Sequence, residues 1–123
     1  MITVLNLFDI LPGRHGDYAN YLRGVGPLLA RHGGRVICYG RTQTVYFGEA
    51  HQEFCGLVQY PSREAMDALS ADADFRAIRP LRDDSTTNYV LSVIEDFDTM
   101  QAAIDFMDAG GHPEHSTSGD THA

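Results

Sequence analysis

The chain has 123 residues, of which 43% are hydrophobic, and its formal net charge is −8. This length is typical of one domain, and no run of about 18 apolar residues is present to span a membrane. The negative charge argues against nucleic acid or an anionic membrane as a partner. The N-terminus lacks the pattern of a secretory signal, so the protein is predicted to be cytoplasmic.

The acidity is concentrated towards the C-terminus. Seven of the 17 acidic residues lie from Glu95 onward, where no basic residue occurs. The preceding part of the chain holds all nine basic residues and is nearly balanced in charge. All nine are arginines, so chemistry through a Schiff-base lysine is excluded.

Hydrophobic periodicity divides the chain into alternating strands and helices. Strands are predicted over residues 2–10, 35–47, 52–60 and 86–96, where β-branched and aromatic residues are frequent. Helices are predicted over residues 16–32, over 62–82 with a pause near residue 70, and over 98–109, where Asp98 is the expected cap. Accordingly, we expect an α+β barrel domain over 1–97, a C-terminal helix over 98–110 and a disordered polar tail over 111–123.

The order of these elements is β-α-β-β-α-β, the ferredoxin-like arrangement with a four-stranded antiparallel sheet and helices on one face. Both faces of the predicted strands are mainly apolar, which an open, wet sheet would not show. We therefore predict a homodimer formed through the uncovered sheet face. The apolar side of the C-terminal helix is expected to cover either the barrel mouth or the partner subunit.

Three segments of the chain resemble the domain-of-unknown-function 1330 family, a branch of the dimeric α+β barrel superfamily. The resemblance covers roughly residues 3–95 and is carried by His32-Gly33-Gly34-Arg35, by Tyr60-Pro61-Ser62, and by Phe75 with Arg79-Pro80-Leu81-Arg82. Gln59 departs from the pattern, because an acid is expected there. The resemblance implies the fold without one activity. Related branches include cofactor-free monooxygenases of aromatic polyketides, muconolactone-type isomerases, polyketide cyclases and haem enzymes.

Candidate site residues fall into two groups. His15 and Asp9 flank the end of the first strand, where an imidazole beside a carboxylate can move a proton. The family pattern adds Arg79, which shares a helix face with Arg76 and Arg82 and can clamp an anion. Isolated polar and aromatic strand residues are the predicted ligand contacts; they are Asn6, Phe8, Tyr39, Arg41, Gln59, Asn88 and Ser92. The alternative is that these groups satisfy one another or line the dimer seam, and that the arginines pair with nearby acids.

The leading functional hypothesis is a cofactor-free enzyme acting on a small apolar or aromatic metabolite by isomerisation, cyclisation, dehydration or oxygenation. The alternatives are a non-catalytic carrier of such a metabolite and a structural dimer without a ligand. No cofactor is predicted, because the sequence lacks a glycine-rich phosphate loop and a flavin signature. No metal is predicted either, because the histidines of the tail, His112, His115 and His122, have no rigid helix to present them.

Overall fold

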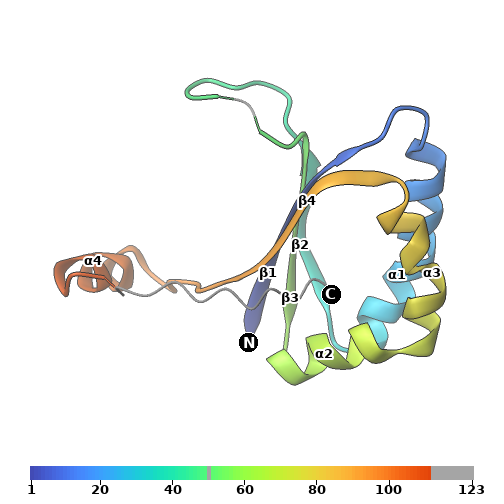
Figure 1. The fold of residues 1–123 in the computed structure, drawn as a ribbon. Helices are drawn as coiled ribbons and strands as arrows, with labels where there is room; N and C mark the ends of the chain where they lie inside the picture. The colour runs from blue at the N-terminus through green and yellow to red at the C-terminus, as the bar shows by residue number, and fades with distance from the viewer. Residues whose placement is uncertain (50, 112–123) are drawn as a thin grey trace.

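The fold is seen in a computed structural model of the protein, which describes residues 1–49 and 51–111 (Figure 1). The elements follow in the order β1 (Ile2–Ile10), α1 (His15–Arg31), β2 (Arg35–Arg41), β3 (Phe54–Tyr60), α2 (Arg63–Ala71), α3 (Ala73–Asp83), β4 (Thr86–Ile94) and α4 (Met100–Asp108). Nearly all of the predicted tail, residues 112–123, lies outside the described residues. No helix in the described part of the chain is both long and apolar enough to cross a membrane.

The four strands form one antiparallel sheet in the order β2-β3-β1-β4, and α1, α2 and α3 lie on one of its faces (Figure 1). This confirms the predicted α+β, ferredoxin-like β-α-β-β-α-β fold. The pause predicted near residue 70 is real. Asp72 ends α2 and begins α3 as its N-cap, accepting a hydrogen bond from the backbone of Asp74 at 2.9 Å.

Three predicted boundaries were wrong. The hairpin strands are shorter than expected, because β2 ends at Arg41 and β3 begins only at Phe54. The segment between them carries exposed apolar side chains, Tyr46 and Phe47 among them, so no packing holds it in the sheet. The cap of α4 is Thr99 rather than Asp98, and its hydroxyl accepts from the backbone of Ala102 at 3.0 Å.

The core lies between the sheet and the helices. Its centre is Phe8, which is fully buried on β1 and stacks on Phe54 and Tyr89 at centroid distances of 5.6 and 5.1 Å. Alternate positions of β1 and β3 face the helices, because the side-chain period of a strand is two. The apolar residues buried there are Val4, Phe8, Val25, Leu28, Val58, Met66, Leu69 and Phe75.

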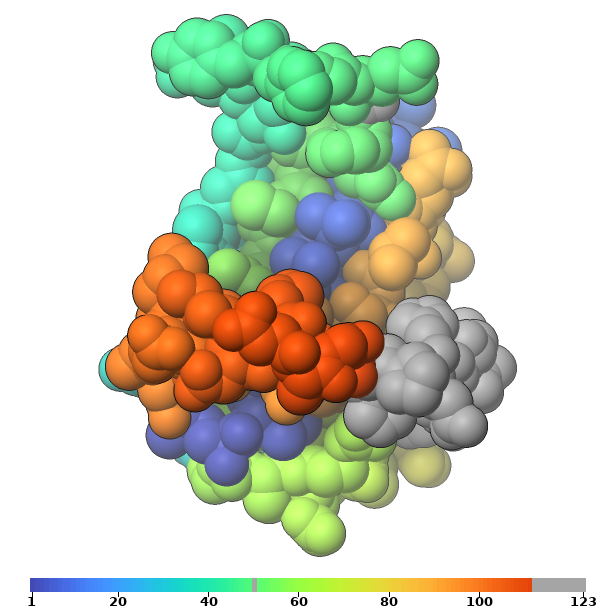
Figure 2. Space-filling model, turned by 90° about the vertical axis from the view of Figure 1, so that its left-hand side faces the viewer, coloured from blue at the N-terminus to red at the C-terminus, as the bar shows by residue number. Residues whose placement is uncertain are grey.

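In the described part of the chain, none of α1, α2 and α3 packs on the opposite face of the sheet, which is mainly apolar. Leu5 and Leu57 pair across β1 and β3 on this side, and Val90 of β4 is 46% exposed there. Figure 2 shows this face, with α4 across its lower part, the β2–β3 connection above it, and the strands visible between them. No residue of α4 is buried, and Met100 and Met107 on it are largely exposed.

The turn after α1 depends on a glycine. Gly33 has a φ of +77°, and a Cβ atom added there would lie 2.8 Å from Cγ of Pro61. Both the left-handed backbone and this close approach exclude a larger residue. The turn also carries the chain directly into β2, so it fixes how α1 is placed over the sheet.

The substitution Gly33→Ala is expected to destabilise the protein by about 1–3 kcal/mol, because the left-handed backbone and the contact with Pro61 both become strained. Chemical denaturation measures this change. Gly13→Ala is the matched control, since Gly13 has a similar φ of +78° with nothing near its absent side chain. An equal loss in both variants would show that the contact with Pro61 contributes nothing.

Candidate functional site

A cavity of about 280 Å³ lies between the helix-facing side of the sheet and α1, α2 and α3. Five of the chain's six tyrosines line it, together with one arginine, Arg82. We call it the tyrosine pocket. Its lining residues are Val4, Asn6, Tyr18, Tyr21, Leu22, Val25, Gly26, Leu29, Val36, Tyr39, Val58, Tyr60, Met66, Leu69, Ser70, Phe75, Arg82, Tyr89 and Leu91.

The pocket opens between α1 and the edge strand β2. The exposed members of its lining are on these two elements: Leu22 is 38% exposed, Val36 49% and Tyr39 43%. By contrast, Tyr21, Phe75 and Arg82 are all buried. A ligand that enters past Tyr39 therefore meets aromatic walls first and the guanidinium of Arg82 at the inner end.

Phenol groups supply most of the polarity of the pocket. The hydroxyls of Tyr18 and Tyr39 hydrogen-bond to each other, and the Tyr89 hydroxyl donates to Oδ1 of Asn6 at 2.8 Å. Burial raises the pKa of Tyr18 and Tyr89, and it raises the pKa of Tyr39 to about 12. These phenols are therefore protonated at neutral pH and act as hydrogen-bond donors.

Arg82 brings the positive charge into the pocket. Its guanidinium carbon lies 5.2 Å from the ring centre of Tyr89 and 6.0 Å from those of Tyr21 and Phe75. Its Nε and Nη2 each lie 3.0 Å from Oδ1 of Asp83, whose side chain is 45% exposed. Burial disfavours the charged form, but Tyr21, Tyr89 and Asp83 outweigh this and raise the pKa of Arg82. The cation is permanent at any ordinary pH.

A bulge in the edge strand puts Tyr39 into the pocket. Val36 and Cys38 pair with consecutive residues of β3, so one extra residue of β2 stands between them. Without that residue, Tyr39 would face away from the helices, because alternate side chains point to opposite faces. Its ring lies across Gly56, where an added Cβ atom would come within 2.9 Å of Cε2 of Tyr39. Gly56 thus leaves the space that the ring occupies.

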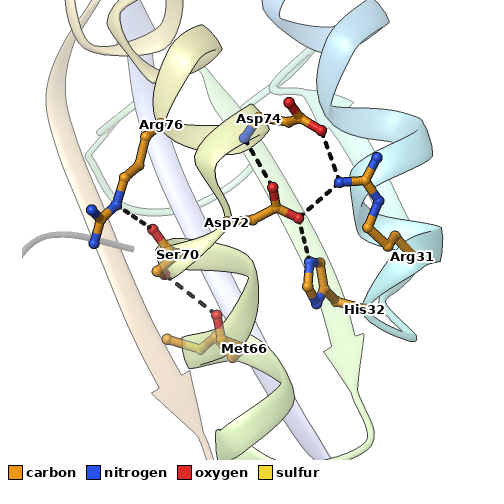
Figure 3. Close-up of polar contacts among 7 residues, drawn as sticks. All are labelled: Arg31, His32, Met66, Ser70, Asp72, Asp74 and Arg76. Atoms are coloured by element: carbon orange, nitrogen blue, oxygen red, sulfur yellow. Dashed lines mark hydrogen bonds and ion pairs between the residues drawn. The ribbon is translucent and has the colours of Figure 1, made fainter.

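The α2–α3 junction that closes one side of the pocket is held by the carboxylate of Asp72 (Figure 3). One oxygen accepts from Nη1 of Arg31 at 3.0 Å and lies 2.7 Å from Nε2 of His32. Arg31 and His32 end α1, so these contacts tie that helix to the junction. Just before Asp72, the Ser70 hydroxyl donates to the Met66 carbonyl at 3.3 Å, and both residues line the pocket.

Three of the residues predicted from the sequence meet at this site. Asn6 and Tyr39 line the pocket, and Phe8 lies beneath it, with its ring centre 5.1 Å from that of Tyr18. Asn6 Nδ2 also lies 3.4 Å from the Gly56 carbonyl. These three residues lie on the helix side of the sheet rather than between two sheets.

The structure separates the other predicted polar residues from these three. Gln59 and Ser92 lie on the opposite face, and Gln59 accepts a hydrogen bond from Arg35 at 2.9 Å. Arg41 is exposed and pairs with Glu53 at 3.1 Å. Asn88 stands at an irregularity of β4 with a φ of 54°. The pairing register separates these residues, because Gln59 pairs with Thr3 and Ser92 with Leu5, which face the other side of β1 from Asn6.

The predicted catalytic residues also lie outside the lining of the pocket. Asp9 accepts from Nδ2 of Asn88 at 3.0 Å and from the backbone of Glu53 at 2.7 Å. These bonds, that from Asn88 above all, lower the pKa of Asp9. His15 is exposed at the start of α1. Arg79 pairs with Asp83 at 3.2 Å and lines a surface groove beside α2 and α3.

The predicted site lacked the other four tyrosines and the arginine of the lining: Tyr18, Tyr21, Tyr60, Tyr89 and Arg82. The sequence indicated part of this set, since Tyr18 and Tyr21 stand three residues apart on one face of the first helix and Arg82 shares a helix face with Arg76 and Arg79. In the described part of the chain, no three His, Cys, Asp or Glu side chains come together as metal ligands would. The histidines of the tail lie outside that part.

Comparison with known proteins gives a family and a fold. Residues 13–97 match the family model described as Domain of unknown function (DUF1330). None of the curated proteins compared with the chain matches it. A protein of unknown function from Rhodopseudomonas palustris, RPA0582, is similar in structure with a TM-score of 0.71 and 24% identity, over 80% of this chain and 83% of that one.

Two further solved structures share the fold at lower identity. A dimeric ferredoxin-like protein of unknown function from Jannaschia sp. CCS1 has a TM-score of 0.66 and 12% identity, over 77% of this chain and 98% of its own. SnoaB, a cofactor-independent oxygenase from Streptomyces nogalater, has a TM-score of 0.59 and 11% identity, over 80% and 95%.

The pairing of Asp72 makes a prediction about acid stability. The hydrogen bond from His32, with that from the Asp74 backbone, lowers the pKa of Asp72 from 3.8 to about 2. The folded state therefore holds fewer protons than the unfolded state between these values, and stability falls as the pH drops from about 4 to 2. We expect Asp72→Asn, which keeps a capping side chain, to be less stable at pH 7 and to lose part of this acid dependence.

Thermal unfolding between pH 7 and pH 2 measures both effects. Asp74→Asn is the control, because it removes the other carboxylate that lies 3.0 Å from Arg31 while leaving the contact with His32 intact. An unchanged acid profile for Asp72→Asn would mean that its carboxylate does not hold the junction.

Proposed function

Since this chain belongs to the DUF1330 family, which is defined without an activity, we propose its function from the site itself. In this proposal the protein is a small cofactor-free enzyme that acts on an apolar or aromatic metabolite held in the tyrosine pocket. The observation that carries it is the pocket: an apolar, aromatic cavity with a few convergent polar groups, the usual form of a small-molecule site.

The volume of the cavity limits the size of the metabolite. About 280 Å³ equals the space of about nine water molecules at roughly 30 Å³ each. A molecule with one ring fits this space, and a larger ligand must extend through the mouth beside Tyr39. Rings on several sides favour a flat ligand, because aromatic groups pack by offset stacking or edge to face.

The proposed chemistry uses the polar groups that face the cavity. The hydroxyl of Tyr39 and the Nδ2 group of Asn6 orient a carbonyl or phenol oxygen, and the Tyr89 hydroxyl holds Asn6 in place through its hydrogen bond to Oδ1. Arg82 stabilises the negative charge that develops on that oxygen during isomerisation, cyclisation, dehydration or oxygenation. Arg82 takes the part that the sequence suggested for Arg79, because only Arg82 of the two lines the pocket.

The fold is compatible with such chemistry. Among similar solved structures, one is described as an antibiotic biosynthesis monooxygenase, with a TM-score of 0.59 and 15% identity. SnoaB is described as a cofactor-independent oxygenase. These descriptions belong to those proteins, and that of SnoaB supports our proposal of a reaction without a cofactor.

A second candidate is a non-catalytic carrier of the same kind of metabolite. It is favoured by one feature: the residues that line the tyrosine pocket in the described part of the chain include no carboxylate and no imidazole. A group that abstracts a proton near neutral pH is therefore missing from the walls. Turnover separates the two candidates, since both require binding in the same place.

We also propose that the protein is a homodimer formed through the open face of the sheet. That face is apolar at Leu5, Leu57 and Val90, and a single helix layer leaves it uncovered. The apolar residues of α4 and of the β2–β3 connection stand on the same side, where they can pack on a second copy (Figure 2). The dimeric protein from Jannaschia supports this arrangement by its fold.

Blocking the mouth of the pocket tests the proposed site. Gly26 lines the pocket on α1, and nothing lies within 4 Å of its absent Cβ atom. We expect Gly26→Phe to weaken binding of single-ring phenols, enones and benzoates by about tenfold or more, because a large side chain intrudes on their space. Gly16→Phe is the matched control, as this helical glycine is equally open and lies outside the lining.

Binding of the panel is measured by isothermal titration, and turnover in air by liquid chromatography with mass detection. Binding with turnover, both reduced in Gly26→Phe, is the expected result for an enzyme. Binding without turnover would identify the carrier. If no panel compound binds and native mass spectrometry finds no retained molecule, the protein is a structural dimer.

The dimer has its own test. Val90→Asp places a charge on the apolar face and is expected to convert dimers to monomers, because the interface would bury an unpaired carboxylate. Sedimentation velocity measures the species present. Asn20→Asp adds the same charge to an exposed position of α1 and should leave the dimer intact. A wild-type monomer, or a Val90→Asp dimer, would contradict the proposal.

A further inference from the structure

The charge in the tyrosine pocket is of one sign. Among the lining residues in the described part of the chain, Arg82 is the only charged one, and it is 6% exposed. The other polar groups there are phenols, one amide and the Ser70 hydroxyl. A phenol donates its proton in a hydrogen bond, so most of these groups suit an oxygen that accepts.

Asp83, a carboxylate that pairs with Arg82, lies towards solvent. Asp83 pairs with Arg82 at 3.0 Å and also with Arg79 at 3.2 Å, so one half-exposed carboxylate serves two guanidinium groups. Asp83 does not line the pocket. On the inner side Arg82 faces the rings of Tyr21, Phe75 and Tyr89, which leave its charge in a region of low polarity.

We infer that the pocket selects a planar organic anion, a phenolate, enolate or arene carboxylate, and holds its negative oxygen against the buried guanidinium of Arg82. This inference rests on the proposed function, because it takes the same pocket as the binding site. Charge-assisted hydrogen bonds from a guanidinium are among the strongest available to a protein. The flat ring packs between the aromatic side chains, and a tyrosine hydroxyl donates a hydrogen bond to the oxygen.

The consequence for a weakly acidic ligand is ionisation on binding. A phenol that enters as the neutral form gives its proton to solvent water and remains as phenolate beside Arg82, so charge and atoms balance. An opposite charge nearby favours the ionised form, and the pKa of the bound phenol therefore falls. The protein thereby holds an electron-rich ring without a base in its walls.

4-Nitrophenol is the probe, because its ionised form is yellow and it fits a cavity for one ring. We expect the wild-type protein to bind it as 4-nitrophenolate, seen as a visible absorbance that persists at a lower pH than for the free compound. 4-Nitroanisole, its neutral analogue of similar shape, should bind about 10- to 100-fold more weakly. Benzoate should compete with 4-nitrophenolate.

Variants connect this preference to one side chain. Arg82→Met should weaken 4-nitrophenolate binding by about 10- to 100-fold while leaving 4-nitroanisole binding within about threefold. Arg82→Lys should retain part of the preference, and it tests the charge if the methionine variant does not fold. Arg23→Met is the matched control, since Arg23 on α1 is exposed, pairs with Asn20 at 2.7 Å and lies outside the pocket.

Two results would overturn the inference, and only the second would also overturn the proposed function. If both compounds bind wild type equally and no ionisation accompanies binding, the preference for an anion is wrong while the pocket remains the site. If neither compound binds and Gly26→Phe also changes nothing for the panel of ligands, the pocket is not a binding site, and the proposed function is lost as well.

Discussion

A single layer of helices can cover only one face of a sheet, and the rest of this structure depends on that constraint. On the covered side, the rings of Phe8, Tyr18 and Tyr89 fill the space next to the strands. The layer of α1, α2 and α3 does not cover the apolar side chains on the other side of the sheet. The two faces therefore differ: one encloses a ligand-sized cavity, and the other is the surface on which we propose that a second copy of the chain packs.

The cavity combines two properties. Its phenols stay protonated because partial burial raises their pKa, so they add hydrogen-bond donors without negative charge. Arg82, the one cation among the described lining residues, contacts the ring faces and a carboxylate at the surface, and it brings positive charge to the cavity. A core built for stability alone would fill this space with aliphatic side chains. The polar side chains of the cavity therefore support a role in ligand binding or catalysis.

Packing and site are linked through the α2–α3 junction. Asp72 begins α3, accepts hydrogen bonds from the end of α1 and stands next to residues that line the pocket (Figure 3). Arg82 lies on the same helix, nearly three turns further on. The contacts that fix the junction thus also fix the direction from which the guanidinium enters the cavity.

The element order and the uncovered apolar face followed from the sequence, because they depend on the pattern within each segment and on the order of the segments. The face on which each predicted residue lies did not, since it depends on the pairing register of the strands and, for Tyr39, on the extra residue in β2. The choice between Arg79 and Arg82 was also beyond the sequence. Three helical positions differ by about 60° around the axis, and only the packing of α3 on α1 decides which one meets the cavity.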